Sequence, residues 1–244
     1  MLESDEVAQG NKPDWHFNPD LLLRWSHQFG PLKLTASTDA SVDRFLARSD
    51  VDLDTVFGSL RLALTDGRSS RLVPYASYTA TADFEPTFGR PEDVLHDFAV
   101  GAYSGFGVNA EGKLIPYVET TKPGDVALGI DLQAGRRLAD PKDFANRFVI
   151  AKVTFAYIDS KEWEIDLTPK VRLRWYDDFA GEFRRDVKPS AVLKTVWTPL
   201  WLTRLNRRAE VDLSVSFEKN YSTLPQARFI DWEVGPTVAL GWKF

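Results

Sequence analysis

The final stretch of the chain, FIDWEVGPTVALGWKF (229–244), alternates between apolar residues and polar or small residues. Successive side chains of a β-strand point to opposite faces of the sheet, so the stretch predicts a strand with one apolar and one polar face. The apolar face holds Ile230, Trp232, Val234, Val238, Leu240, Trp242 and Phe244. The other face holds Asp231, Glu233, Gly235, Thr237, Ala239, Gly241 and Lys243.

This stretch resembles the closing strand of Gram-negative bacterial outer-membrane β-barrel proteins, porins among them. Those proteins end in an aromatic residue, usually Phe, with apolar residues at every second position before it. The resemblance implies outer-membrane lipid and lipopolysaccharide against the apolar face, and water or packed polar groups against the other. It also implies insertion by the barrel-assembly machinery through the C-terminal strand, and a periplasmic C-terminus.

Similar alternation recurs along the chain and predicts an all-β fold, a transmembrane antiparallel up-and-down β-barrel of about twelve strands. We expect the barrel to occupy residues 20–244, after an N-terminal periplasmic tail or linker at 1–19. The segment 113–120 is included because Lys113–Tyr117 weakly repeats the pattern of Arg71–Tyr75. The expected strands are 20–29, 32–43, 54–65, 71–84, 96–108, 113–120, 125–135, 147–158, 162–176, 189–201, 210–220 and 229–244.

Composition excludes several other classes of protein. The chain has no Cys and a formal charge of -5, which argues against a disulfide framework and against nucleic-acid binding. No apolar run approaches the roughly 20 residues that a membrane-spanning helix needs. The acidic start Met1–Asp5 is not a signal peptide, so we expect that one was removed from the mature protein.

Tryptophans mark the ends of the apolar faces. Trp163 and Trp175 lie twelve residues apart on one strand, which corresponds to roughly 28 Å along a tilted strand and fits an apolar band between two aromatic girdles. A soluble barrel or sandwich with these tryptophans in its core is the alternative. The expected membrane-girdle residues are Trp25, Trp163, Trp175, Trp197, Trp232, Trp242 and Phe244.

The opposite, inward faces carry charge, and we expect basic side chains there to face acidic ones across the lumen. Such walls would line a narrow porin-like channel for passive diffusion of small hydrophilic solutes or ions. The same side chains could instead interlock and fill the lumen, and about twelve strands leaves both readings open. The candidate pore-lining residues are Lys170, Arg172, Arg174, Lys194, Glu218, Asp231 and Glu233.

Two other functions compete with the channel. A non-conducting structural or assembly barrel would present the extracellular loops 136–146 and 177–188 to a partner. An outer-membrane lipid- or peptide-hydrolysing barrel needs a catalytic group, and no catalytic residue is expected here. His16, His27 and His96 each lack the Ser two residues later that barrel phospholipases use.

No cofactor or metal is expected. Asp50, Asp52 and Asp54 share one side of an extended segment but lack the Gly and distal Glu of a calcium loop, so we expect a solvated acidic turn. Counting strands back from the C-terminus makes 136–146, 177–188 and 221–228 outer loops. The same count makes 45–53 and 85–95 inner turns and Gly30-Pro31 an outer turn.

Overall fold

The computed structural model of the chain describes residues 16–17, 19–45, 52–65, 72–117, 120, 122–160, 162–177, 181–199, 201 and 207–242. They form one 13-stranded antiparallel sheet. The strands are β1 (His16–Phe17), β2 (Asp20–Phe29), β3 (Leu32–Phe45), β4 (Leu53–Leu64), β5 (Val73–Phe84), β6 (Pro91–Val108), β7 (Leu114–Pro116), β8 (Val126–Asp140), β9 (Asn146–Ile158), β10 (Trp163–Tyr176), β11 (Arg185–Trp197), β12 (Arg207–Ser222) and β13 (Phe229–Trp242). Two 3-10 turns, η3 (Lys142–Phe144) and η4 (Pro225–Ala227), precede β9 and β13.

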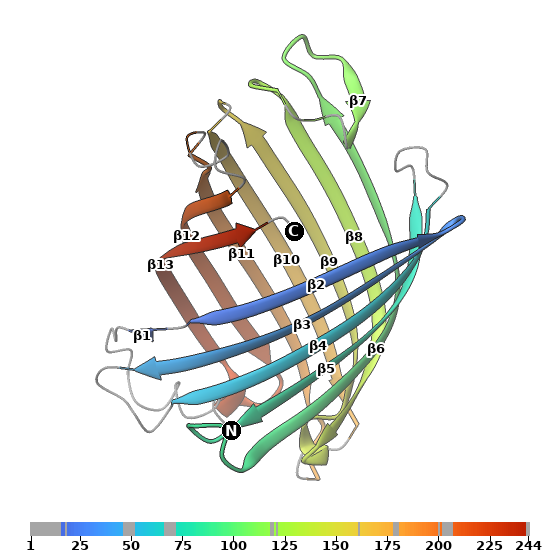
Figure 1. Cartoon of the computed structure of the whole chain (residues 1–244). Coiled ribbons are helices and arrows are strands. Elements are labelled where there is room, and N and C mark those ends of the chain that lie inside the picture. Colours follow the sequence, from blue (N-terminus) through green and yellow to red (C-terminus); the bar gives the residue numbers. More distant parts are fainter. Residues whose placement is uncertain are drawn as a thin grey trace.

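The strands follow an up-and-down path, each hydrogen-bonded to the next long strand along the chain. The sheet curls strongly, so that β2 to β5 pass in front of the later strands in the view of Figure 1. Within the described residues, β2 pairs with β3 and β13 with β12, and no register joins β2 to β13. The predicted all-β, antiparallel up-and-down architecture of about twelve strands is confirmed.

Each of the twelve expected segments contains a strand, but the segment 113–120 does not cross the sheet. Only Leu114–Pro116 forms a strand there, and it pairs with the last residues of β6. β8 then pairs with β6 along its whole length, from Val126 opposite Val108 to Asp140 opposite Val94. The short repeat at 113–117 therefore produces a hairpin extension, and β6 and β8 are consecutive crossings.

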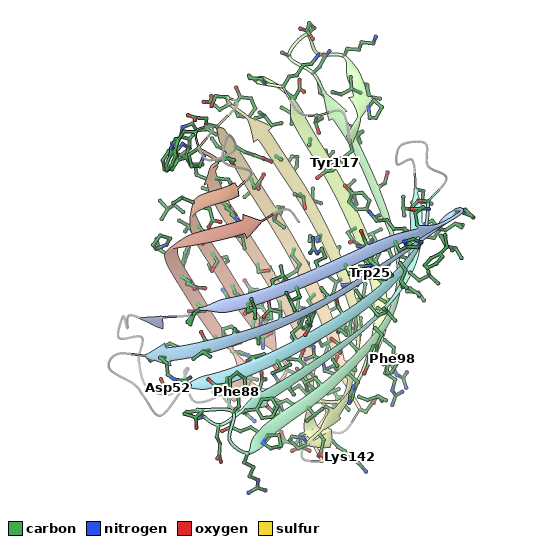
Figure 2. All side chains as sticks on the ribbon, in the orientation of Figure 1. Trp25, Asp52, Phe88, Phe98, Tyr117 and Lys142 are labelled. Atoms are coloured by element: carbon green, nitrogen blue, oxygen red, sulfur yellow. The ribbon has the colours of Figure 1, made fainter. Side chains whose placement is uncertain are left out.

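This change alters which connections share an end of the sheet. Because β7 does not cross, the end of β3, the start of β4 and the connection 85–90 lie at the same end of the sheet as η3 and η4, which we call the η3 end. Gly30-Pro31, β7, the end of β9 and the start of β10 lie at the opposite, β7 end. The expected placement of 45–53, 85–95 and Gly30-Pro31 was therefore wrong. Figure 2 shows Lys142 and Phe88 toward the η3 end and Tyr117 toward the β7 end.

The two faces of the sheet have the reverse of a soluble protein's burial. Along β8, apolar residues such as Ile130 and Leu132 are exposed, while the polar residues between them are half-buried. Trp163 is 44% exposed and Trp232 is 65% exposed. Soluble proteins usually bury such side chains, and in this structure neither of these two tryptophans lies in a core.

Among the described residues, the structure buries ten polar or charged residues, which belong to the concave face or to the ends of strands, beside a smaller set of buried apolar and aromatic side chains that includes Tyr75 and Phe148. The polar or charged residues are Asp54, Asp125, Asn146, Arg174, Arg184, Asp186, Lys188, Asp212, Asn220 and Ser222. The large apolar residues of the convex face include Phe98, at the outer side of the curl in Figure 2. The sheet thus encloses its charged face and leaves its apolar face uncovered.

Glycines of the inner face make room for aromatic rings. A Cβ placed on Gly101 would lie 2.6 Å from Cζ of Tyr75, and one placed on Gly135 would lie 2.6 Å from Cζ of Phe148. Both contacts are shorter than real Cβ atoms make, so only glycine fits beneath these rings. The two rings therefore lie close against the inner wall.

Candidate functional site

The candidate site is the inner face of the sheet, because its charged side chains are enclosed by the curl. In an antiparallel ladder, residues directly opposite each other share a face. The register runs from Lys170 through Ser190 and Glu218 to Asp231 across four strands. All seven predicted pore-lining residues lie on this one face: Lys170, Arg172, Arg174, Lys194, Glu218, Asp231 and Glu233.

The charges form pairs along the wall between neighbouring strands. Lys188 Nζ lies 2.6 Å from Glu218 Oε1, and Lys194 Nζ lies 2.6 Å from Asp212 Oδ2. Both pairs join β11 to β12. The sequence led us to expect Glu218 to face the basic residues across the lumen, but the register places it beside them on the same part of the wall.

A second set of inner-face contacts joins β4, β5, β6 and β8, and sequence reasoning missed it. Arg137 donates two hydrogen bonds of 2.7 Å to Asp97. The Tyr75 hydroxyl donates to Asp131 Oδ1 at 2.5 Å, and the Arg61 guanidinium lies 3.7 Å from the centre of the Tyr75 ring. Arg137 was missed because the expected strand ended at residue 135, two residues before it; its inward parity was the signal that could have found it.

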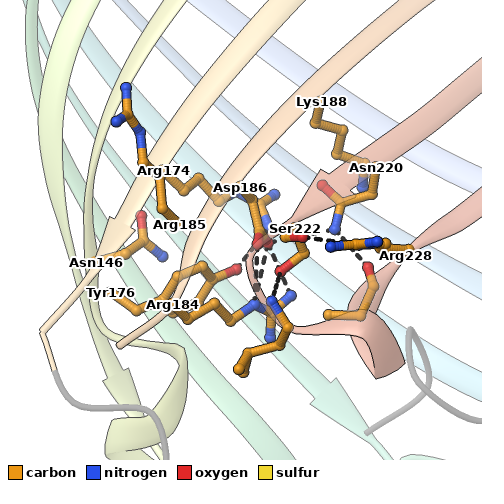
Figure 3. A network of polar contacts seen from close by, with 12 residues as sticks. Asn146, Arg174, Tyr176, Arg184, Arg185, Asp186, Lys188, Asn220, Ser222 and Arg228 are labelled. Carbon is orange, nitrogen blue, oxygen red and sulfur yellow. Dashed lines mark hydrogen bonds and ion pairs between the residues drawn. The ribbon is translucent and has the colours of Figure 1, made fainter. Parts of the chain in front are cut away.

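A buried polar network closes the inner face at the η3 end (Figure 3). Arg184 Nη2 donates to Asp186 Oδ2 at 2.8 Å, and Asp186 is only 1% exposed. Asn220 Nδ2 donates to the Ala227 carbonyl at 2.6 Å, and it lies 3.4 Å from Asp186 Oδ2. The network ties the start of β11 to the end of β12 and to η4.

The start of β4 is held in a similar way. Arg44 Nη2 lies 2.6 Å from Asp54 Oδ1, and the Phe88 N–H donates to Asp54 Oδ2 at 2.7 Å. The Phe45 N–H donates to Asp52 Oδ1 at 2.8 Å. Asp54 is fully buried, so the expected solvated acidic turn was wrong at this position; Asp50 lies outside the described residues.

The expected girdle residues lie on the outer face near strand ends. Trp163 and Trp197 stack at the β7 end with ring centroids 6.0 Å apart. At the η3 end, the Arg185 guanidinium lies 5.4 Å from the centre of the Trp175 ring, and Trp232 packs on Phe217 with centroids 4.6 Å apart.

Trp25 stacks against His27 at 5.9 Å between ring centroids, and it is exposed. The side chains of the two remaining girdle positions, Trp242 and Phe244, cannot be placed. The backbone of Trp242 continues β13, but its side chain and the whole of Phe244 lie outside the described residues.

Neither His27 nor His96 meets the inner carboxylates. His27 shares the outer face with Trp25, and His96 Nδ1 lies 2.9 Å from the Tyr78 hydroxyl on the same outer face. Asp97 points inward to Arg137, so His96 and Asp97 are on opposite faces as the sequence predicted. The side chain of His16 lies outside the described residues.

Among the described residues, no three His, Asp or Glu side chains come together as a metal site would require. None of the described helices is both long enough and apolar enough to cross a membrane. The chain matches no protein-family model, no curated protein and no solved structure.

Proposed function

We propose that this chain is a Gram-negative outer-membrane β-barrel whose charged inner face lines a narrow, porin-like channel for passive diffusion of small hydrophilic solutes or ions. The observation that carries the proposal is the reversal of the two faces. Exposed Leu, Val, Phe and Trp cover the convex side, while the polar groups are enclosed. Such a surface is stable against hydrocarbon and unfavourable against water.

The arrangement of inner side chains favours a passage over a filled lumen. Lys188 and Lys194 are neutralised by carboxylates on the adjacent strand, so these charges need no partner on the far wall. The rings of Tyr75 and Phe148 lie over glycines of the wall. Both features hold long side chains close to the sheet, which is the arrangement that a passage through the centre requires.

Planar-bilayer recording tests the channel. Protein refolded in detergent is first checked by a change of gel position on boiling, which a closed barrel produces. It is then added to a bilayer in potassium chloride, and discrete unitary currents are expected. A well-folded sample that inserts and gives no unitary currents would refute the channel.

A structural or assembly barrel is the second candidate, and the buried network at the η3 end favours it. Asp186 and Asn220 are almost fully buried and hold the connection between β12 and β13 against the start of β11. A rim held this firmly suits the presentation of a fixed surface to a partner. The two expected outer loops, 136–146 and 177–188, are partly strand, because β8 continues to Asp140, β9 begins at Asn146 and β11 begins at Arg185.

Replacement of 141–145 by a short Gly-containing turn separates this role from the channel. Loss of a co-purifying partner with unchanged conductance would favour presentation, whereas an unchanged partner profile would count against it.

For insertion itself, we propose contact with outer-membrane lipid and lipopolysaccharide through the exposed apolar face. We also propose recognition by the barrel-assembly machinery through β13.

A further inference from the structure

Positive charges lie directly opposite one another on the inner face of β9, β10 and β11, whereas the pairs described above join opposite charges. Lys152 of β9 lies directly opposite Lys170 of β10, and Arg172 of β10 lies directly opposite Lys188 of β11. Arg174 follows on the same face of β10. Like charges directly opposite one another on neighbouring strands are destabilising, so this sheet holds two such pairs side by side.

In this group of basic residues, as far as the structure describes the chain, carboxylate partners are found beside Lys188 but not beside Lys170 or Arg172. Glu218 binds Lys188 at 2.6 Å. Asp131 lies opposite Lys152 in the register, but it accepts the Tyr75 hydroxyl, and no ion pair within 4.0 Å joins it to Lys152 in the described part of the chain. Among the described residues, neither Lys170 nor Arg172 forms an ion pair within that distance.

Arg172 carries a more specific sign that a partner is missing. Its Nε is buried and makes no hydrogen bond within the described structure. Arg137 nearby is different, because Asp97 satisfies it with two hydrogen bonds. Buried donors in native proteins nearly always have a partner, and a guanidinium matches the oxygens of a carboxylate or phosphate. Arg172 also lines a small hollow with Arg174, Asn146 and the Asp97–Arg137 pair, whose carboxylate is already bound by Arg137.

We propose that Lys152, Lys170 and Arg172 form an anion-binding station on the inner wall, taking small oxyanions such as phosphate or carboxylates and making the channel anion-selective. The proposal rests on the proposed function for its role in transport. An anion between these side chains would relieve the repulsion across β9–β10–β11 and would supply the acceptor that Arg172 Nε lacks. The station would attract anions although the chain as a whole carries a net charge of -5.

Reversal potentials measured across a potassium chloride gradient test the selectivity. The wild-type channel should pass chloride in preference to potassium. The double variant Lys170→Gln/Arg172→Gln should lower that preference by about tenfold, the lower end of the range for charge-focused clefts. Arg24→Gln/Lys33→Gln is the matched control, because it removes two positive charges from the inner face of β2 and β3, and it should keep most of the preference.

Binding is also measured without current, so that a failed channel and a failed station can be told apart. Phosphate should raise the temperature at which the detergent-folded protein loses its unboiled gel position, and the Lys170→Gln/Arg172→Gln variant should lose this increase. Where currents exist, potassium preference in the wild type or an unchanged chloride preference in that variant would overturn the station. Where no currents exist, the phosphate shift decides alone: a shift lost in the variant supports the station without the channel, and no shift in the wild type overturns both.

Discussion

Arg137 on β8 binds Asp97 on β6 through two parallel hydrogen bonds, from Nε to Oδ1 and from Nη2 to Oδ2, each 2.7 Å long. The two residues are directly opposite in the register and both lie on the enclosed face. The side chain of Asp97 is 22% exposed and that of Arg137 is 18% exposed. A two-point ion pair shielded from water in this way is stronger than a surface ion pair.

A double-mutant cycle of Asp97→Ala and Arg137→Ala should therefore give a coupling free energy of about 1–3 kcal/mol. The measurement is urea unfolding of the protein in lipid vesicles, followed by tryptophan fluorescence. Arg136 and Asp177 supply the control pair, 2.8 Å apart and 51% and 30% exposed. Their coupling should stay below about 1 kcal/mol, and equal coupling for the two pairs would contradict the enclosure of the inner face.

Substitution of neighbouring residues on β10 separates the two faces. Leu167 lies exposed on the apolar face, and Thr168 lies on the inner face. Leu167→Arg should reduce the free energy of unfolding in a bilayer by about 2–4 kcal/mol, because it places a charge in hydrocarbon. Thr168→Arg should have a milder effect. Equal effects of the two substitutions, measured by urea unfolding in vesicles, would argue against lipid contact at Leu167.

The inner-wall glycines should not tolerate a methyl group where an aromatic ring covers them. A Cβ on Gly135 would lie 2.3 Å from the Phe98 carbonyl oxygen and 2.6 Å from Phe148 Cζ. We expect Gly135→Ala to destabilise the fold by about 1–3 kcal/mol through overpacking. Gly58→Ala is the control, since a Cβ there meets nothing within 4 Å. If both variants unfold at the wild-type urea concentration, Phe148 does not rest on this wall.

The stacked pair of Trp163 and Trp197 should stabilise the β7 end. Trp163→Ala should cost about 1 kcal/mol, the usual worth of an aromatic pair beyond its buried area. Trp163→Phe should restore most of that loss, because it keeps a ring against Trp197. The free energies of unfolding are compared in lipid vesicles. An Ala variant as stable as wild type would show that this stacked pair does not stabilise the β7 end.

Much of the fold was readable from period-two alternation alone. The parity of Ile165 and Leu167 against Glu164 and Asp166 predicted which face is exposed and which is enclosed, and the structure has both. The predicted strand ends were less accurate where charged residues continue a strand, as at Arg136-Arg137 on β8. Those residues resemble a loop in sequence, and they remain in the ladder because each finds a carboxylate partner.

The sequence by itself determined the two-faced character of the strands, because alternation is a local property of extended backbone. Only the tertiary structure decided which charges meet. Register decides that Lys188 pairs with Glu218 and that Lys152 lies opposite Lys170. Register also decides that 113–120 forms a hairpin extension and not a strand that crosses the sheet. Register is set where two neighbouring strands pair, by the turn that joins them and by the fit of both faces, and the alternation within a single strand does not encode it.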